Sequence, residues 1–259
     1  MRTIDLNGKS ALVTGVANHR SLAWAIAEAL GSAGCRLAFT YQGERVRESV
    51  ESLAAKFPGS PVLPCDVTRD EEMDAVFSRL ERERGALHFL IHSIAFARRE
   101  DLEGEFRKTS REGWNTALEI SAFSFVALAH RAARLIPEDA GGSILTLTFQ
   151  ASQRVFPNYN VMGSAKAALE HAVRQLAYEL GPRNVRVNAI SAGPVSTLSA
   201  RGVSGFTGML STNRERAPLR RNVEAREVGD AALFLCSDLA TGITGTVLHV
   251  DAGYNVMGV

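Results

Sequence analysis

The 259-residue chain has little cysteine and almost no surplus of either charge. Its three cysteines, Cys35, Cys65 and Cys236, are odd in number and scattered, which argues against a disulfide framework or a zinc site and favours reduced thiols in the cytoplasm. With 29 basic against 28 acidic residues, the chain lacks the positive charge of a dedicated nucleic-acid binder. No apolar run approaches the length of a membrane-spanning helix, and residues 1–8 lack the apolar core of a secretory signal. We therefore expect a cytoplasmic protein that binds neither nucleic acid nor membrane.

Short β-branched runs alternate with longer amphipathic stretches along the chain. The predicted strands span residues 10–14, 36–41, 61–65, 87–92, 143–148, 185–190 and 246–250. The predicted helices span residues 21–32, 44–56, 70–84, 112–135, 159–180 and 224–235. Strands separated by helix-length segments are typical of βαβ units and a parallel sheet. The sequence therefore predicts one α/β domain over residues 1–259, a doubly wound parallel sheet with helices on both faces.

One long stretch, residues 193–222, lacks a clear helix or strand period. It is rich in glycine and other small residues. Irregular stretches of this length in compact domains are usually functional or mobile. We interpret this stretch as a lid over a pocket, while a surface excursion with no role remains the alternative.

The turn between the first predicted strand and helix contains Gly15, followed by Ser21 and Ala23. A glycine there lets the backbone turn sharply and approach a ligand, and the helix N-terminus attracts a pyrophosphate. The usual dinucleotide fingerprint has three glycines, of which only Gly15 is present here. An ordinary strand–helix connection capped by Ser21 explains the same residues.

The next two strand ends carry polar residues suited to an adenosine. Gln42 offers a ribose hydroxyl an uncharged partner, while Glu44 disfavours and Arg45 favours a 2′-phosphate, so the cofactor choice is weakly specified. Asp66 is suited to meet an adenine amino group, with Val67 covering the ring. A turn or helix-cap role explains Asp66 equally well.

Tyr159 and Lys166 lie seven residues apart at the start of the longest predicted helix. Seven residues make about two helical turns, so both side chains share one face if the helix begins near Tyr159. An ammonium near a phenol favours the phenolate and stabilises negative charge beside the hydroxyl. The alternative is a buried tyrosine beside a surface lysine, and the position of the pair beyond the strands of a parallel sheet weighs against it.

Three motifs carry a resemblance to a known family. The first turn reads Gly-x5-Ser-x-Ala, the fourth strand ends in the sequence HSIAFA at residues 92–97, and the tyrosine and lysine have the spacing Tyr-x6-Lys. Residues 157–163 and 186–194 match as well. With these motifs the chain resembles the short-chain dehydrogenase/reductase superfamily, and within it the enoyl-[acyl-carrier-protein] reductases of bacterial fatty acid synthesis. The resemblance spans nearly the whole chain and implies a Rossmann-type fold.

The resemblance also implies roles for individual residues. Tyr159 corresponds to the catalytic tyrosine and also contacts substrate, Lys166 is the lysine that binds the nicotinamide ribose, and Ala97 borders the acyl substrate. The implied cofactor-binding residues, besides Lys166, are Gly15, Ser21, Leu22, Gln42, Asp66, Val67, Ser93, Ile94, Val195, Ser196, Thr197, Leu198 and Ser199.

Two departures from the family pattern stand out. Phe149 occupies the position of a second family tyrosine and has no hydroxyl, so its catalytic role is doubtful, and we expect it to form a wall of the acyl pocket. Residues 202–212 lack the basic side chains that relatives present to the acidic carrier protein, although Arg201, Arg214 and Arg216 flank them.

The implied function is NADH-dependent reduction of the trans-2 double bond of enoyl thioesters on acyl carrier protein, with NADPH less favoured. The resemblance further implies a homotetramer, and the apolar C-terminal residues 252–259 would be unusual left in water. One alternative is a 3-ketoacyl or other carbonyl reductase, which would use Thr146, thirteen residues before Tyr159. The other is a catalytically weak dinucleotide-binding regulator, which only Phe149 favours.

Overall fold

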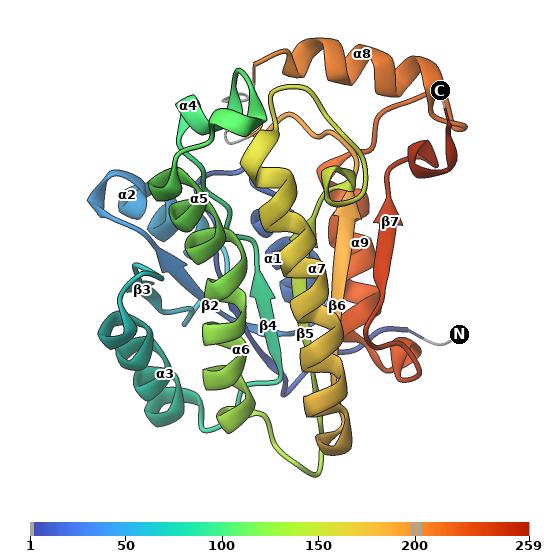
Figure 1. Cartoon of the computed structure of the whole chain (residues 1–259). Coiled ribbons are helices and arrows are strands. Elements are labelled where there is room, and N and C mark those ends of the chain that lie inside the picture. The colour runs from blue at the N-terminus through green and yellow to red at the C-terminus, as the bar shows by residue number, and fades with distance from the viewer. Residues whose placement is uncertain (1–2, 198–199, 201–203, 259) are drawn as a thin grey trace.

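A single seven-stranded parallel sheet organises the molecule (Figure 1). The computed structural model describes residues 3–197, 200 and 204–258. The strand order is β3-β2-β1-β4-β5-β6-β7, and every pair is parallel. The strands are β1 (Ser10–Val13), β2 (Arg36–Tyr41), β3 (Val62–Pro64), β4 (Phe89–His92), β5 (Gly142–Thr148), β6 (Val185–Ala192) and β7 (Val247–Val250). The predicted fold class is confirmed.

Helices cover both faces of the sheet. The described α-helices are α1 (Leu22–Ser32), α2 (Glu44–Ala54), α3 (Asp70–Arg84), α4 (Arg99–Leu102), α5 (Arg111–Leu118), α6 (Ser124–Leu135), α7 (Asn160–Leu180), α8 (Phe206–Arg216) and α9 (Ala225–Cys236). Side chains of α1, α2 and α9 belong to one buried apolar cluster, and side chains of α3, α6 and α7 belong to the other.

The strands supply both clusters because their side chains alternate between faces. Leu12 and Leu90 pack into the cluster under α6 and α7, while their neighbours Val13 and Ile91 pack under α1 and α9. The strand order reverses between β1 and β4, and in such sheets a crevice opens beyond the carboxyl ends of the strands at that point. Figure 1 shows α8 beyond this edge.

Two predicted segments differ from the structure. The helix predicted over 112–135 is divided into α5, a π-helical turn at Glu119–Phe123, and α6. The apolar period continues through all three pieces, which is why the sequence suggested one helix. The stretch 193–222, predicted to be irregular, contains α8, whose glycine and small polar residues obscure its period. The short helix α4 was not predicted.

Candidate active site

A cavity of about 770 Å³ opens at the carboxyl edge of the sheet. It brings together residues from segments that lie far apart in the sequence. The predicted site residues that line it are Gly15, Ser21, Leu22, Gln42, Val67, Ser93, Ile94, Ala97, Phe149, Tyr159, Lys166, Val195 and Thr197. Asp66 and Ser196 are absent from this lining, and Leu198 and Ser199 lie outside the described residues.

The turn after β1 has the shape that a pyrophosphate requires. Gly15 has a φ of +86°, and a Cβ there would overlap the carbonyl oxygen of Ser93. Only glycine allows both this conformation and this close approach of two strand ends. The N-terminus of α1 follows, with no acidic residue in its first turn. Residues and backbone therefore fit a dinucleotide, whose pyrophosphate would lie against the turn and the positive end of the helix.

Ser21 organises this turn instead of capping the helix. Its Oγ accepts hydrogen bonds from the backbone N–H groups of Ala17 (3.0 Å) and Asn18 (3.1 Å), and it makes no side-chain cap on α1. The alternative of a simple N-cap is therefore wrong. Ser21 fixes the loop that leads into the helix and leaves the helix end uncapped.

A polar pair lies where the sequence predicts the adenosine to bind. The amide Nε2 of Gln42, which lines the cavity, donates to the carboxylate of Asp66 at 3.3 Å. Asp66 also accepts hydrogen bonds from the backbone N–H and the hydroxyl of Thr68. Burial acts to raise the pKa of Asp66, but these hydrogen bonds outweigh it, and the pKa lies below its usual value. The turn role that the sequence offered as the alternative is thus present, and the contact of Asp66 with an adenine stays a prediction.

Tyr159 sits at the N-cap of α7, directly before the helix begins. The ring of Phe149 meets it edge-on at a centroid distance of 5.2 Å, and the ring of Phe156 lies 4.7 Å from Phe149 on another side. Phe149 lines the cavity as an apolar wall. It orients the Tyr159 ring by packing, since a phenyl group offers no hydrogen bond.

Lys166 lies two turns further along α7 and is only 5% exposed. Its Nζ donates to the carbonyl oxygen of Leu147 at 2.8 Å. Burial lowers the pKa of Lys166 to about 8, against the opposing effect of the nearby Glu170 carboxylate. Glu170 is itself buried and accepts a hydrogen bond from the Thr148 hydroxyl at 2.7 Å. The ammonium group is therefore held in place from the end of β5 and from its own helix.

The expected effect of Lys166 on Tyr159 is not seen. The sequence suggested that the ammonium would favour the phenolate, whereas burial raises the pKa of Tyr159 above its usual value. Burial alone accounts for this shift, so the hydroxyl remains protonated at neutral pH. Tyr159 is therefore a hydrogen-bond donor to any oxygen placed beside it.

The loop after β4 is held by a residue that the sequence analysis missed. Ser121, fully buried in the π-helical turn, accepts a hydrogen bond from the backbone N–H of Phe96 (2.9 Å) and donates to its carbonyl (3.1 Å). This contact fixes the loop that contains Ser93, Ile94 and Ala97. A serine in an apolar helical stretch was the signal that could have found it.

Thr146 does not serve as a cavity residue. It is fully buried, and its hydroxyl lies 2.9 Å from Nδ1 of His92, whose Nε2 lies 2.9 Å from the hydroxyl of Ser124. Burial, with a smaller effect of Lys166, lowers the pKa of His92 to about 3, so this histidine is neutral. The position expected of a carbonyl reductase's hydroxyl is thus committed to a structural network.

Helix α8 adds two further cavity residues, Phe206 and Met209. Their spacing of three residues was the available signal, hidden in a segment predicted to be irregular. Within the described ranges, no group of three or more His, Cys, Asp or Glu side chains could hold a metal ion, and no helix is long and apolar enough to cross a membrane.

With this sheet, glycine turn and Tyr–Lys pair, the chain falls in the short-chain dehydrogenase/reductase class of oxidoreductases. Residues 15–255 match the family model described as "Enoyl-(Acyl carrier protein) reductase". The chain belongs to this family.

Individual relatives agree over the full length. The enoyl-[acyl-carrier-protein] reductase [NADH] FabI of Bacillus cereus is 54% identical, with 98% of this chain and 99% of that protein covered. A crystal structure of the Bacillus cereus enoyl-acyl carrier protein reductase with NADP+ and indole naphthyridinone has a TM-score of 0.96 at 53% identity, covering 99% of this chain and 100% of that one. The Anaplasma phagocytophilum enzyme in complex with NAD has a TM-score of 0.94 at 45% identity, covering 100% and 98%.

Proposed function

We propose that this protein reduces the trans-2 double bond of enoyl thioesters carried on acyl carrier protein, with NADH as the reductant. The observation that carries the proposal is the convergence of a protonated tyrosine and a buried lysine on a cavity with a glycine-turn pyrophosphate site. Relatives that match over the full chain are named for this reaction.

NADH, when bound, would supply a hydride to the β-carbon, and the reduction is completed when a proton adds to the α-carbon. The Tyr159 hydroxyl donates a hydrogen bond to the thioester oxygen, where negative charge collects as the bond is reduced. This bond strengthens only as charge develops, so it lowers the barrier more than it tightens substrate binding. The ammonium of Lys166 would hold the ribose hydroxyls of the cofactor and adds a positive field behind the reacting oxygen.

The side chains at the adenosine end of the cavity favour NADH over NADPH, because they are either uncharged or of opposite charge. Gln42 is uncharged, and Glu44 opposes Arg45, so a 2′-phosphate finds no net positive site. Relatives from Bacillus cereus and Rhizobium meliloti are named for NADH, while one from Staphylococcus aureus is named for NADPH. NADH is the preferred cofactor and NADPH the weaker one.

Residues 193–222 act as a lid that covers the bound substrate. Helix α8 faces the cavity with Phe206 and Met209, and Gly205 at its N-cap has a φ of +81°. The helix is thus joined to the preceding chain by a residue that tolerates large backbone changes. Closure would exclude water from the reacting groups.

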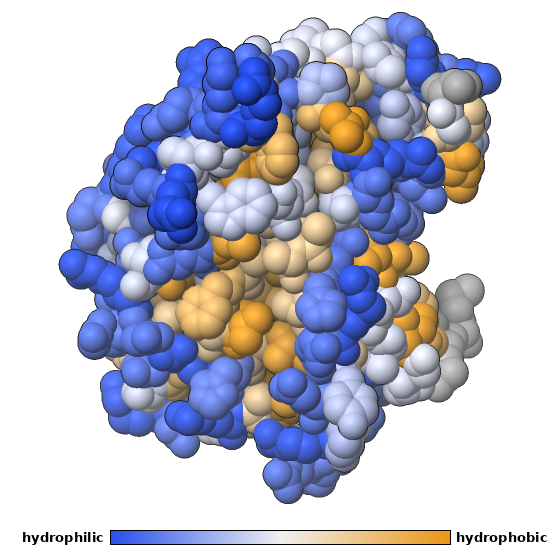
Figure 2. Space-filling model, viewed as in Figure 1, coloured by the Kyte–Doolittle hydropathy of each residue, from blue (hydrophilic) through white to orange (hydrophobic). Residues whose placement is uncertain are grey.

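The protein assembles as a cytoplasmic homotetramer. Figure 2 shows apolar side chains gathered over α6 and α7 on the face away from α1 and α9. Phe123, in the π-helical turn, is 59% exposed, and Val256 near the C-terminus is 71% exposed. A contiguous exposed apolar patch is typical of a protein–protein interface. Within the lid, Arg214 and Arg216 in the last turn of α8 offer positive charge to an acidic carrier protein.

A direct assay tests the proposal. We expect purified protein to oxidise NADH with crotonyl thioesters and longer enoyl thioesters, followed by absorbance, and to leave 3-ketoacyl thioesters unreduced. Reduction of the ketone in preference to the enoyl thioester would contradict the assignment. Tight binding of NADH without oxidation of it by either substrate would favour a regulator.

A further inference from the structure

A second cavity of about 390 Å³ adjoins the main one on the other side of Phe149. The two cavities share one wall, formed by Phe149, Ala192, Gly193, Pro194 and Met209. Phe149 packs directly against Tyr159, so only the Phe149 ring separates the second cavity from the Tyr159 ring. No role in the proposed reaction accounts for it.

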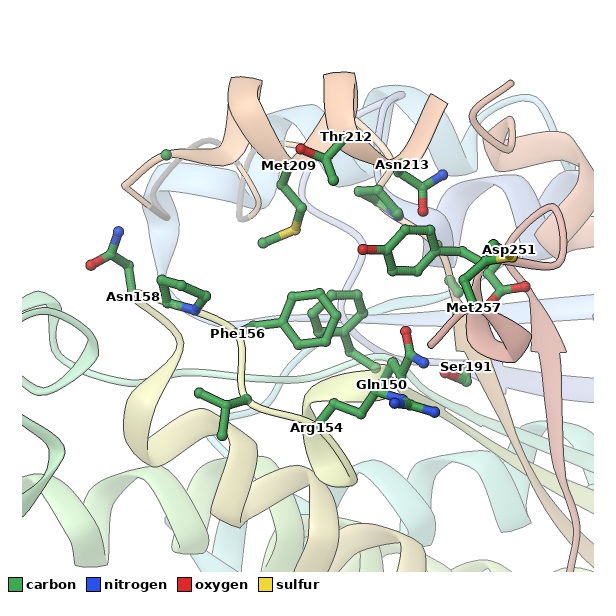
Figure 3. A pocket seen from close by; sticks show the side chains of 18 of the residues that line it. Gln150, Arg154, Phe156, Asn158, Ser191, Met209, Thr212, Asn213, Asp251 and Met257 are labelled. Carbon is green, nitrogen blue, oxygen red and sulfur yellow. The ribbon is translucent and has the colours of Figure 1, made fainter. Parts of the chain in front are cut away.

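The roof of this cavity contains an unsatisfied polar atom. Figure 3 shows Met209, Thr212 and Asn213 projecting from α8 toward Gln150 and Arg154 on the opposite side. Asn213 is 2% exposed, and its Nδ2 donates to Oδ1 of Asn222 at 3.1 Å. Its own Oδ1 is buried and has no hydrogen-bond partner among the described residues. A buried acceptor without a donor is costly, so a ligand that supplies an N–H or O–H group is favoured here.

The remaining polar groups narrow the class of ligand. Asp251 already accepts hydrogen bonds from the backbone N–H groups of Gly253 and Asn255 and from the Asn255 side chain, so it is not available to bind a cation. Arg154 is exposed and forms no ion pair with any residue in the described ranges. The cavity thus combines an inner acceptor, an apolar wall and a cationic group whose side chain reaches solvent.

We propose that this cavity receives the pantetheine arm of the acyl thioester. The inference rests on the proposed function, because that reaction requires a thioester at Tyr159. An enoyl thioester has two arms: a methylene chain, which has no hydrogen to donate, and a thiol arm with two amides that ends in a phosphate. The amide N–H matches Asn213 Oδ1, the apolar part of the arm packs on Phe156, and the phosphate reaches toward Arg154. The acyl chain stays in the main cavity.

Comparison of truncated thioesters tests the inner contact. Crotonyl pantetheine has both amides, and crotonyl N-acetylcysteamine has one. We expect the wild-type protein to show a kcat/KM about tenfold higher for crotonyl pantetheine, the effect of one satisfied buried acceptor. Asn213→Leu should remove most of this preference. The exposed substitution Thr207→Ala, on the same helix but outside both cavities, should keep it.

A charge series tests the outer contact and does not depend on whether Asn213→Leu folds, because Arg154 is exposed. We expect crotonyl phosphopantetheine to exceed crotonyl pantetheine in kcat/KM by about threefold at low salt, as for an exposed ion pair. Arg154→Gln should abolish this preference and Arg154→Lys should retain it. Arg174→Gln removes an exposed charge from α7 far from the cavity lining and is the matched control.

The possible outcomes distinguish failure of the proposed function from failure of the pantetheine assignment. If no enoyl thioester is reduced, the proposed function fails. If crotonyl N-acetylcysteamine is reduced but neither the second amide nor the phosphate improves kcat/KM, the function stands and the pantetheine assignment is overturned. Asn213→Leu could instead alter the preference between short and long acyl chains and keep the preference for crotonyl pantetheine. That result would show that the acyl chain binds in this cavity, and it would also overturn the pantetheine assignment.

Discussion

At the scale of single residues, burial sets the protonation of Tyr159 and Lys166, the two groups that we propose to be catalytic. Desolvation raises the pKa of Tyr159 and lowers that of Lys166 to about 8, so the tyrosine is protonated and the lysine carries its charge only below that pH. The two shifts have the same origin and opposite directions, because each favours the neutral form. The pair therefore works in the neutral range.

The lowered pKa of Lys166 predicts the pH dependence of the reaction. The ammonium is needed, and its folded-state pKa is about 8, so activity is present below that pH and lost as pH rises through it. We expect kcat/KM to fall about tenfold per pH unit above the pKa. In Lys166→Arg the guanidinium stays charged, and the decline should vanish whatever the absolute rate. A decline that persists unchanged in Lys166→Arg would assign it to another group.

Phe149 occupies the position of a second family tyrosine, and we predict that restoring this tyrosine has a small effect on activity. Since we propose that the Tyr159 hydroxyl supplies the hydrogen bond to the developing charge, Phe149→Tyr should change kcat/KM by no more than about threefold. Steady-state kinetics with a crotonyl thioester measures this. An increase of tenfold or more would mean that the chain is catalytically impaired at this position.

Most of the predicted site residues line the large cavity, because they lie in local motifs, each close to a strand end. Gly15, Tyr159 and Lys166 are of this kind. Ser121 and Asn213 could not be predicted from the sequence, because their roles depend on partners or a cavity that the fold brings to them. The pKa of Tyr159 was also misjudged, since a sequence shows its charged neighbours but not its burial.

At the scale of elements, the π-helical turn between α5 and α6 determines how the cleft is built. It carries Ser121 to the loop after β4 and is followed by Ser124, which meets His92. Sequence periodicity could not show the turn, because the apolar face continues through it. The boundaries of the regular strands were predicted more closely, since their β-branched runs end where the sheet ends.

Ser121→Ala tests the part that this turn plays. The substitution leaves the N–H and carbonyl of Phe96 without their partner, so the free energy of unfolding should fall by about 1–3 kcal/mol. Because the loop carries Ala97, the KM for the thioester should also rise. Urea unfolding and initial-rate kinetics measure the two effects, with the exposed Ser78→Ala on α3 as the control. If Ser121→Ala were as stable as the control, the proposal that Ser121 holds the loop after β4 would be wrong.

At the scale of the whole molecule, the parallel sheet joins turns that are far apart in the chain into one cavity. The strand order places β1 beside β4 and β4 beside β5, so the residues that follow them meet at one edge. This much follows from alternating strands and helices. The apolar face over α6 and α7 follows only from the folded surface, since exposure cannot be inferred from hydropathy along the chain.

The exposure of Phe123 leads to a prediction about the oligomeric state of the protein. Wild-type protein should sediment at about four times the chain mass of 27.9 kDa. Phe123→Glu would bury a charge at the interface and should yield smaller species, while Ser78→Glu on the exposed side of α3 should not. A wild-type monomer in sedimentation velocity would contradict the proposed tetramer.

The most direct test of the account is Tyr159→Phe, which removes one hydroxyl and little else. We predict that kcat/KM with a crotonyl thioester falls by about 10²–10³-fold, as for loss of one oxyanion donor. The Kd for NADH, measured by fluorescence, should stay nearly unchanged. Turnover in Tyr159→Phe equal to that of wild type would contradict the central claim that this phenol stabilises the charge formed as the double bond is reduced.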